Sequence, residues 1–166
     1  MKGDVGDNRI IMFVCSGNTC RSPMAEGFMN RCLEDISGDL PFTACSSGTM
    51  ASPGLPANPM ALKAMQEHGI DISRHRSSPT GIWIPPEETL FFGMTRVHRR
   101  ELQSIFPGRS SRIFLLGEAA GLGLEQEEVP DPFGASLEHY REIALILRKM
   151  VLGLLDSINS DPRFSA

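Results

Sequence analysis

Short runs of branched and aromatic residues alternate with helix-like segments along this chain. This alternation predicts a doubly wound α/β domain, with a parallel sheet covered by helices on both faces. The chain has 166 residues, enough to bury a core, and we expect residues 1–166 to form a single domain. Ligands of such sheets bind at the carboxyl ends of strands, so the loop after the first strand is the first place to look for a site.

The first strand is predicted over Arg9–Val14, where the sequence reads RIIMFV. A loop over Cys15–Arg21 follows it. Ser22 and Pro23 suit the start of a helix, with serine as the N-cap and proline at the first helical position. Apolar residues then recur at helical spacing, and they are Met24, Ala25, Phe28, Met29, Cys32, Leu33 and Ile36.

Further strands and helices are expected downstream. The strands are Phe42–Ser47, Thr89–Met94 and Arg112–Leu116. The helices are Pro59–Glu67, which Gly69 is expected to terminate, Arg96–Phe106 and the long amphipathic segment Leu137–Ile158. The segment Gly117–Val129 is rich in glycine and acidic residues, and we predict neither a helix nor a strand there.

Charge and hydropathy exclude several classes of protein. The formal net charge of -4 argues against broad nucleic-acid binding, which needs clustered cations. No apolar stretch approaches the roughly 20 residues that span a bilayer. The N-terminus MKGDVGDNRI carries acids where a signal peptide is basic and then apolar. We therefore expect a cytoplasmic protein that binds neither nucleic acid nor membranes.

The cysteines all lie in the first third of the chain, at Cys15, Cys20, Cys32 and Cys45. A secreted disulfide scaffold would spread them more widely. The spacing of the first two does not match the close pairs of a zinc site. Cys32 and Cys45 are predicted to be small buried hydrophobic residues.

The loop CSGNTCRSP combines features of an anion site with a nucleophile. Gly17 and Asn18 readily adopt left-handed conformations, which would let several backbone N–H groups point inward at a helix N-terminus. Arg21 adds a planar cationic fork that suits two phosphate oxygens. The same surroundings favour the thiolate of Cys15. The spacing C-x5-R-S after a strand is typical of cysteine-dependent phosphatases, whereas a Walker-type nucleotide motif is absent from the sequence.

A proton donor for the leaving group is expected in the segment PDPFG. Asp131 lies there between two prolines, which stiffen a loop and suit a carboxylate held over a pocket. A plain turn is the alternative interpretation, since D-P and F-G are common turn signals.

Taken together, FVCSGNTCRSPMAE and the distant DPFG resemble the low-molecular-weight protein phosphatase family. Other stretches agree in order: SSGT at residues 46–49, HGIDISRHRSS at 68–78 and MTRVHRREL at 94–102. The resemblance covers nearly the whole chain. It implies a three-layer Rossmann-like domain with a four-stranded parallel sheet flanked by helices, no metal or other cofactor, and a two-step mechanism through a phosphocysteine.

The resemblance implies a role for each matching residue. Cys15 would be the nucleophile, Arg21 would hold the phosphoryl oxygens, and Asp131 would protonate the leaving group and then activate water. The remaining phosphate-binding residues would be Ser16, Gly17, Asn18, Thr19, Cys20 and Ser22, the last through a hydrogen bond to Cys15.

A supporting network for the loop is implied in the same way, with Asn18, Ser46 and His75 as its members. A surface histidine is the alternative interpretation of His75. The histidines to which we assign no chemical role are His68, His98 and His139. Cys20 neighbours the nucleophile, and in this family it can form a reversible disulfide with Cys15 under oxidation.

Two positions bear on the substrate. Tyrosine-specific members usually carry Ile or Leu where this chain has Thr19, and often Tyr where it has Phe133. Thr19 with DPFG resembles the protein arginine phosphatase branch instead. Physically, a hydroxyl on the pocket wall can form hydrogen bonds to water or to the N–H groups of a guanidinium, which an isoleucine cannot do. We therefore expect phosphorylated proteins as substrates, phosphoarginine before phosphotyrosine, with phosphate or another oxyanion bound in the active site.

Two other classes are disfavoured. An arsenate reductase shares the fold and C-x5-R, but it needs a further cysteine pair, and nothing beyond Cys45 supplies one. An inactive phosphate-binding module would be expected to lose Cys15, Arg21 or Asp131, and all of them are present.

Overall fold

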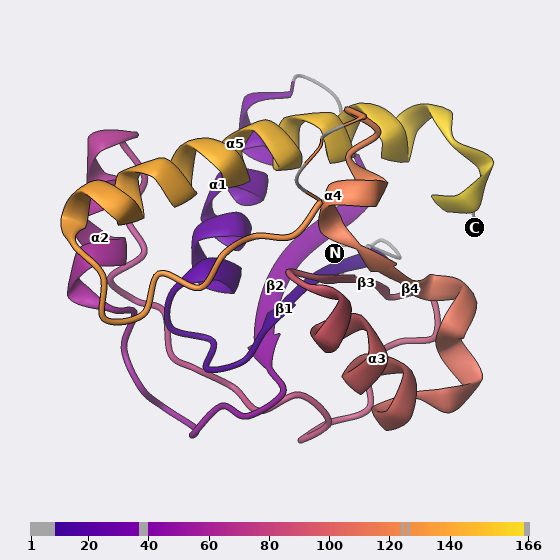
Figure 1. Cartoon of the computed structure of the whole chain (residues 1–166). Helices are drawn as coiled ribbons and strands as arrows, with labels where there is room; N and C mark the ends of the chain where they lie inside the picture. The colour runs from indigo at the N-terminus through magenta and orange to yellow at the C-terminus, as the bar shows by residue number, and fades with distance from the viewer. Residues whose placement is uncertain (1–8, 37–39, 124, 126, 165–166) are drawn as a thin grey trace, which may run out of the picture.

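A computed structural model describes residues 9–36, 40–123, 125 and 127–164 (Figure 1). Within these residues, four strands form one sheet in the order β2-β1-β3-β4. They are β1 (Arg9–Cys15), β2 (Phe42–Gly48), β3 (Leu90–Gly93) and β4 (Ile113–Leu115). Every neighbouring pair is parallel. The predicted parallel α/β architecture is confirmed.

The helices alternate with these strands. They are α1 (Arg21–Asp35), α2 (Pro59–Glu67), α3 (Arg96–Ile105), α4 (Leu116–Ala119) and α5 (Leu137–Ser160), with 3-10 turns at Pro107–Arg112 and Pro162–Phe164. No helix in the described part of the chain is long and apolar enough to cross a membrane.

Helix α2 shows how local sequence sets the ends of an element. Asn58 accepts a hydrogen bond from the backbone N–H of Met60 at 2.8 Å, and Pro59 follows it at the first helical position. Gly69, just beyond the C-terminal end, has a φ of +69°, a conformation that costs glycine little. The predicted bounds of this helix and its glycine stop are confirmed.

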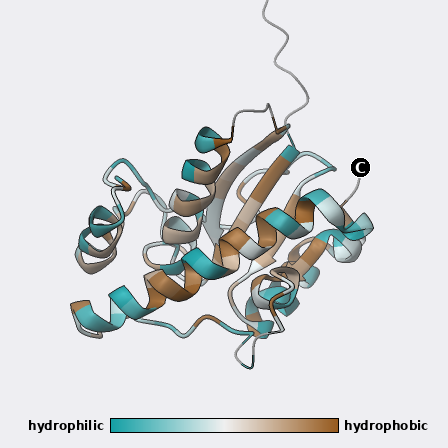
Figure 2. Cartoon of the chain, turned by 90° about the horizontal axis from the view of Figure 1, so that it is seen from above, coloured by the Kyte–Doolittle hydropathy of each residue, from teal (hydrophilic) through white to brown (hydrophobic). Residues whose placement is uncertain are grey.

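Side-chain alternation along β1 divides the core into two layers. Ile11 and Phe13 face the large cluster formed with α1, α2, α4 and α5, whereas Met12 and Val14 face a smaller cluster to which α3 contributes Leu102. Figure 2 shows the long α5 lying across the sheet with its hydrophobic turns interrupted by hydrophilic ones. Helices therefore cover both faces, as predicted.

Some predicted details are wrong. Residues 116–119 form the short helix α4, whereas we assigned Leu116 to the preceding strand and residues 117–119 to neither a helix nor a strand. Leu116 and Ala119 are buried in the core, and one turn is too short to show a periodicity. Cys32 and Cys45 are half-buried at the edges of the two clusters rather than fully buried. Residues 1–8, 124 and 126, to which parts of our sequence interpretation apply, lie outside the described residues.

Candidate functional site

The candidate site lies at the carboxyl end of β1, where the chain leaves toward β2 on one side and β3 lies on the other. Such a switch point leaves a crevice between the loops of adjacent strands. Here it holds a cavity of about 330 Å³. Of the residues predicted from the sequence, the cavity is lined by Cys15, Ser16, Gly17, Asn18, Thr19, Cys20, Arg21, Asp131 and Phe133.

The loop after β1 is held by the segment that follows β2. The carbonyl oxygens of Cys15 and Ser16 accept hydrogen bonds from the amides of Thr49 and Met50, at 2.9 and 3.0 Å. Gly48 makes this approach possible, because a Cβ atom there would collide with the carbonyl oxygen of Ser16. The glycine at the end of β2 therefore sets how closely the two loops lie.

Asn18 is the centre of the loop's hydrogen bonds. Its side chain is fully buried, and its Nδ2 donates to the hydroxyls of Ser22 at 2.8 Å and Ser46 at 2.9 Å. Its Oδ1 accepts the backbone N–H of Ser78 at 2.8 Å. Its carbonyl oxygen lies 2.6 Å from Nε2 of His75. These bonds tie the loop to α1, β2 and the segment after α2.

A left-handed backbone occurs at Asn18, with a φ of +55°, but not at Gly17. The prediction is confirmed for Asn18 and wrong for Gly17. A Cβ atom on Gly17 would make only an ordinary contact, 3.7 Å from Oγ1 of Thr19. The buried side-chain bonds of Asn18 hold its strained backbone, and the curl of the loop comes from that residue.

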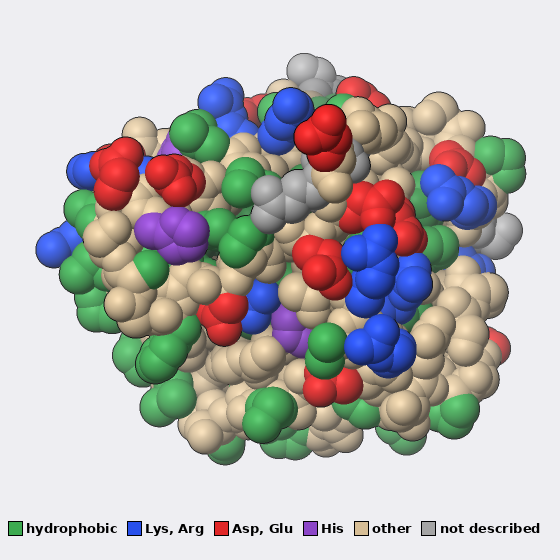
Figure 3. Space-filling view, viewed as in Figure 1, with side chains coloured by type: hydrophobic (Ala, Val, Ile, Leu, Met, Phe, Trp, Pro, Cys, Tyr) green, Lys and Arg blue, Asp and Glu red, His purple; other side chains and the backbone are tan. Residues whose placement is uncertain are grey.

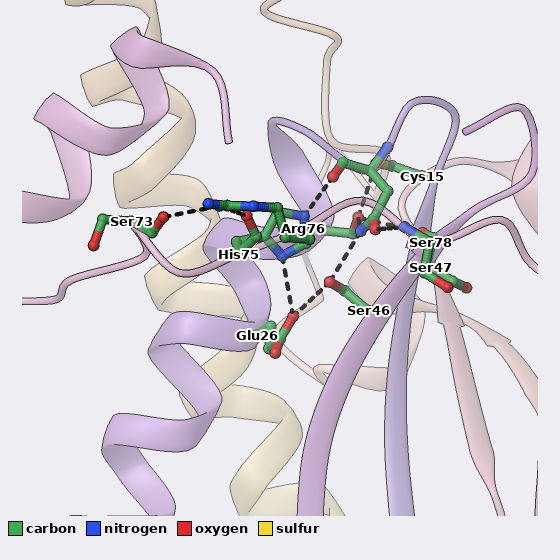
Figure 4. Close-up of polar contacts among 10 residues, drawn as sticks. Cys15, Glu26, Ser46, Ser47, Ser73, His75, Arg76 and Ser78 are labelled. Atoms are coloured by element: carbon green, nitrogen blue, oxygen red, sulfur yellow. Dashed lines mark hydrogen bonds and ion pairs between the residues drawn. The ribbon is translucent and has the colours of Figure 1, made fainter. Parts of the chain in front are cut away.

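Glu26 extends this network, and our sequence interpretation missed it. Its Oε2 accepts a hydrogen bond from Ser46 at 2.5 Å and lies 3.9 Å from Nδ1 of His75 (Figure 4). Burial raises the pKa of Glu26, against the opposing effects of the Ser46 bond and the His75 charge. Its position four residues after Ser22 on α1 is a signal that could have pointed to it. His75 itself is mostly buried, so it is not a surface histidine.

The Cys15 thiol is buried among donors. Its Sγ lies 3.0 Å from the hydroxyl of Ser22 and accepts the backbone N–H of Asn18 at 3.3 Å. The prediction that Ser22 is the N-cap is wrong: α1 begins at Arg21 with Cys20 as its N-cap. The Ser22 hydroxyl instead faces Cys15, where it can donate to a thiolate.

Arg21 and Asp131 meet over the cavity. The guanidinium is buried, its Nη1 donates to the carbonyl of Val129 at 3.1 Å, and its Nη2 lies 3.6 Å from Oδ2 of Asp131. The buried Nε of Arg21 has no hydrogen-bond partner among the described residues. The side chain of Asp131 is 58% exposed, and its Oδ1 accepts the backbone N–H of Phe133 at 3.1 Å. Asp131 thus forms a turn and also faces the cation.

The mouth of the cavity is more apolar than its floor. Phe133 and Met50 are each 77% exposed, and Leu55 and Ser52 complete this rim beside Thr19. We did not predict Met50, Ser52 or Leu55 as site residues. Their loop, TMASPGLPANP, carries no aromatic or charged residue that would mark it as part of a site, and only the fold brings it to the cavity.

Cys20 lies beneath the loop. Its Sγ is 3.3 Å from the hydroxyl of Tyr140 on α5, and burial raises the pKa of this thiol. Cys15 and Cys20 are both free thiols here. Their pairing under oxidation stays a prediction. Within the described residues, no three His, Cys, Asp or Glu side chains are grouped so that they could hold a metal ion.

His98, to which we assigned no role, contacts the loop from α3. It is buried, its Nε2 lies 2.9 Å from Oγ of Ser16, and its Nδ1 lies 3.0 Å from Oγ1 of Thr95. Burial lowers the pKa of His98 to about 4, with a further contribution from the charge of Arg21. The local sequence of α3 does not indicate that its first turn lies beside the end of β1, so the contact of His98 with the loop could not be predicted from it.

Comparison with known proteins identifies the family. A family model described as low molecular weight phosphotyrosine protein phosphatase matches residues 10–163. The chain is 34% identical over 154 residues to a protein-arginine-phosphatase of Bacillus subtilis, covering 92% of this chain and 99% of that protein. It is 33% identical over 143 residues to a probable low molecular weight protein-tyrosine-phosphatase, EpsP, of Ralstonia nicotianae, covering 86% and 91%.

Solved structures agree with these matches. The fold superposes on a YwlE arginine phosphatase with a TM-score of 0.80 at 33% identity, covering 94% of this chain and 99% of that one. A low molecular weight protein tyrosine phosphatase from T. tengcongensis gives a TM-score of 0.78 at 37% identity, covering 89% and 98%. Together with the loop geometry, these matches show that the chain belongs to the low molecular weight phosphotyrosine protein phosphatase family and is a cysteine-based protein phosphatase.

Proposed function

We propose that Cys15 is the nucleophile of a two-step phosphatase reaction and that Asp131 is its acid and base. The observation that carries this proposal is the meeting of three groups in one cavity: a buried thiol in contact with the Asn18 amide and the Ser22 hydroxyl, a buried guanidinium, and a carboxylate 3.6 Å from that guanidinium. Arg21, with its buried unpaired Nε, and the loop amides would bind the phosphoryl oxygens.

In the first step the Cys15 thiolate attacks phosphorus. An S–P bond forms, the bond from phosphorus to the leaving group breaks, and protonated Asp131 gives its proton to the leaving atom. In the second step the Asp131 carboxylate takes a proton from water, which attacks phosphorus as the S–P bond breaks. The products are inorganic phosphate and the Cys15 thiolate, held by Ser22 and the Asn18 amide.

The comparisons lend support to the covalent step. One similar solved structure is of a YwlE arginine phosphatase in which a serine that replaces an active-site cysteine is phosphorylated. We propose that Cys15 occupies the corresponding position. A Cys15→Ser variant is then expected to lose turnover, and hydrolysis by this variant at the wild-type rate would contradict the mechanism.

For the substrate we propose phosphoarginine in proteins. Identity does not separate the two kinds of relative, at 34% to an arginine phosphatase and 33% to a probable tyrosine phosphatase. The argument therefore rests on Thr19, which lines the cavity and whose hydroxyl has, among the described residues, only the weak contact with the Cys20 sulfur, at 3.7 Å. That hydroxyl is available to a guanidinium N–H or to a bridging water, as no aliphatic side chain would be.

Phosphotyrosine is the second candidate, and one observation favours it. Phe133, Met50 and Leu55 form an exposed apolar rim against which a phenyl ring could pack. The same rim can also cover the aliphatic part of an arginine side chain, so it does not oppose the first proposal.

Substitutions at Thr19 separate the two substrates. We expect kcat/KM of the wild type to be higher for a phosphoarginine peptide than for a phosphotyrosine peptide of matched sequence. Thr19→Val, which removes only the hydroxyl, and Thr19→Ile should lower this ratio about tenfold, the value of one or two lost polar contacts. Thr19→Ser keeps the hydroxyl and is the matched control. A wild type that ignores phosphoarginine, or a ratio unchanged in Thr19→Val, would contradict the proposed specificity.

We also propose that the enzyme works in the cytoplasm on phosphorylated proteins. Its four cysteines are free thiols, which suits a reducing compartment. A thiolate nucleophile requires such conditions to stay active.

A further inference from the structure

We propose that His98 is a positioning residue which fixes the Ser16 hydroxyl so that its proton points to the bound phosphoryl group. Ser16 would then add a side-chain donor to the backbone amides of the loop. The inference rests on the proposed function of the Cys15 site, and it concerns a pair of residues on α3 and the loop.

The topology brings these two residues together. β3 lies beside β1, and the amide of Met94 at the end of β3 donates to the carbonyl of Val14 at 3.0 Å. The first turn of α3 therefore starts next to the loop that leaves β1. Ser16 is partly exposed in the cavity while its Oγ lies 2.9 Å from Nε2 of His98.

The first turn of α3 is held from a second side. The amide of Arg96 donates to Oε1 of Glu128 at 2.7 Å, and the amide of Val129 donates to the carbonyl of Met94 at 2.9 Å. Arg96 also pairs with Glu127, and basic and acidic side chains gather over α3 and α4 in Figure 3. The turn that carries His98 is thus fixed by the segment that leads to Asp131.

The imidazole is neutral at physiological pH. It is buried, and the cationic Arg21 opposes a second positive charge beside it. The charged groups that act on it are Glu101 on its own helix and, from neighbouring elements, Arg21, Glu128 and Asp131; burial outweighs the acids. A neutral ring has one donor nitrogen and one acceptor nitrogen.

The partners of the ring allow one chain of donors that ends in the cavity. Oγ1 of Thr95 accepts the backbone N–H of His98 at 3.4 Å, which leaves its own O–H to donate to Nδ1 at 3.0 Å. Nε2–H then donates to Oγ of Ser16, and the Ser16 O–H is left for the cavity. The opposite tautomer would turn an oxygen lone pair toward the phosphoryl group. A bound phosphoryl anion therefore selects the chain from Thr95 through His98 to Ser16.

The test is a double-variant cycle on Ser16 and His98 with an aryl phosphate as substrate. Ser16→Ala and His98→Leu should each lower kcat about tenfold, with KM changed less than about threefold, because the contact strengthens as charge develops on the oxygens. The double variant should fall no further than the lower single variant, since both substitutions remove the same contact. Ser16→Thr and His98→Gln, which keep a hydroxyl and an amide donor, should recover most of kcat. His139→Gln, at a partly exposed position on α5, is the control and should match the wild type.

Two outcomes would overturn the inference: Ser16→Ala within about twofold of the wild type in kcat, or losses that multiply in the double variant. Thermal midpoints of all variants show whether His98→Leu is folded. If that variant does not fold, Ser16→Ala still tests the contact by itself. Calorimetric binding of orthovanadate adds a readout without turnover, and its affinity should fall in both single variants. An inactive wild type would refute the proposed function, whereas an active wild type with unaltered Ser16→Ala kinetics and vanadate affinity would refute only this inference.

Discussion

Asp131 shows how one side chain takes part in a turn and faces the site at once. Its Oδ1 accepts the amide of Phe133, which fixes the turn, and its Oδ2 faces Arg21. The side chain is more than half exposed, so water can reach the carboxylate. This placement suits a group that first gives a proton to a leaving atom and then takes one from water.

The basicity of the leaving group sets how much Asp131 contributes. We expect Asp131→Asn to lower kcat/KM for a phosphoarginine peptide by about 100- to 10,000-fold, the range of general acid catalysis, since kcat/KM reports the first step and not the hydrolysis of the phosphocysteine, in which Asp131 is the base. The loss should be smaller for an aryl phosphate with an acidic phenol, which leaves without a proton. Rapid-quench or steady-state measurement of both substrates checks this order, and equal losses would contradict the role of Asp131 as the acid. The Asp131 carboxylate contacts Phe133 and Arg21, so this test uses a different part of the cavity from the Thr19 variants.

At the scale of elements, the site depends on the close approach of strand ends. Gly48 ends β2 and pairs with Cys15 at the end of β1, where a Cβ atom would collide with the Ser16 carbonyl and crowd Ala51 and the Asn18 amide. The backbone of Gly48 is not left-handed, so glycine is required there because a side chain would not fit and not because of its backbone conformation. The loop geometry is thus set partly by a residue that is not among those lining the cavity.

A single methyl group at this position tests that dependence. Gly48→Ala should displace the loop, lower kcat/KM at least about tenfold, and cost about 1–3 kcal/mol of unfolding free energy. Gly108→Ala is the matched control, because a Cβ atom there meets nothing within 4 Å and the backbone is not left-handed. Activity assays and urea unfolding of the two variants give the comparison. Wild-type activity in Gly48→Ala would show that the loop tolerates the shift.

For the whole molecule, the buried His98 couples stability to pH. Its pKa falls from 6.5 to about 4 in the folded protein, so the unfolded chain binds a proton more readily. Its contribution is present above pH 6.5 and is lost as pH falls toward 4. The pKa of His98 is lowered because burial and the charge of Arg21 outweigh the opposing effect of the acidic Glu101, Glu128 and Asp131.

The expected cost of acid is measurable. Between pH 7 and pH 5, protonation of His98 in the unfolded chain should remove about 2 kcal/mol of unfolding free energy. Urea unfolding at the two pH values measures it, with His98→Gln as the reference that lacks this titration. The wild type should lose more stability on acidification than the variant by this amount. An equal loss in both proteins would show that His98 is not buried as a neutral base.

Much of the fold follows from local patterns in the chain. The apolar strands, the capped start of α2 at Asn58 and the stop at Gly69 each depend on neighbours in sequence, so periodicity and turn chemistry predict them. The single turn α4 does not, because its burial beneath α5 comes from distant residues. Ser22 differs for the same reason: local rules for helix caps make it the N-cap, whereas its bond to Cys15, which the family resemblance implied, depends on the curled loop.

The sequence by itself determined the family and the residues proposed as nucleophile, cation and acid. Cys15, Arg21 and Asp131 lie in short motifs that can be recognised from the order and spacing of neighbouring residues alone. Only the tertiary structure decided which residues support them. His98 contacts the loop from α3, and Glu26 on α1 supports it through Ser46 and His75; their roles depend on burial and on hydrogen bonds across 82 and 20 residues of chain. Such contacts arise because parallel strands place their carboxyl ends at one edge of the sheet, a consequence of strand order that no local stretch of sequence encodes.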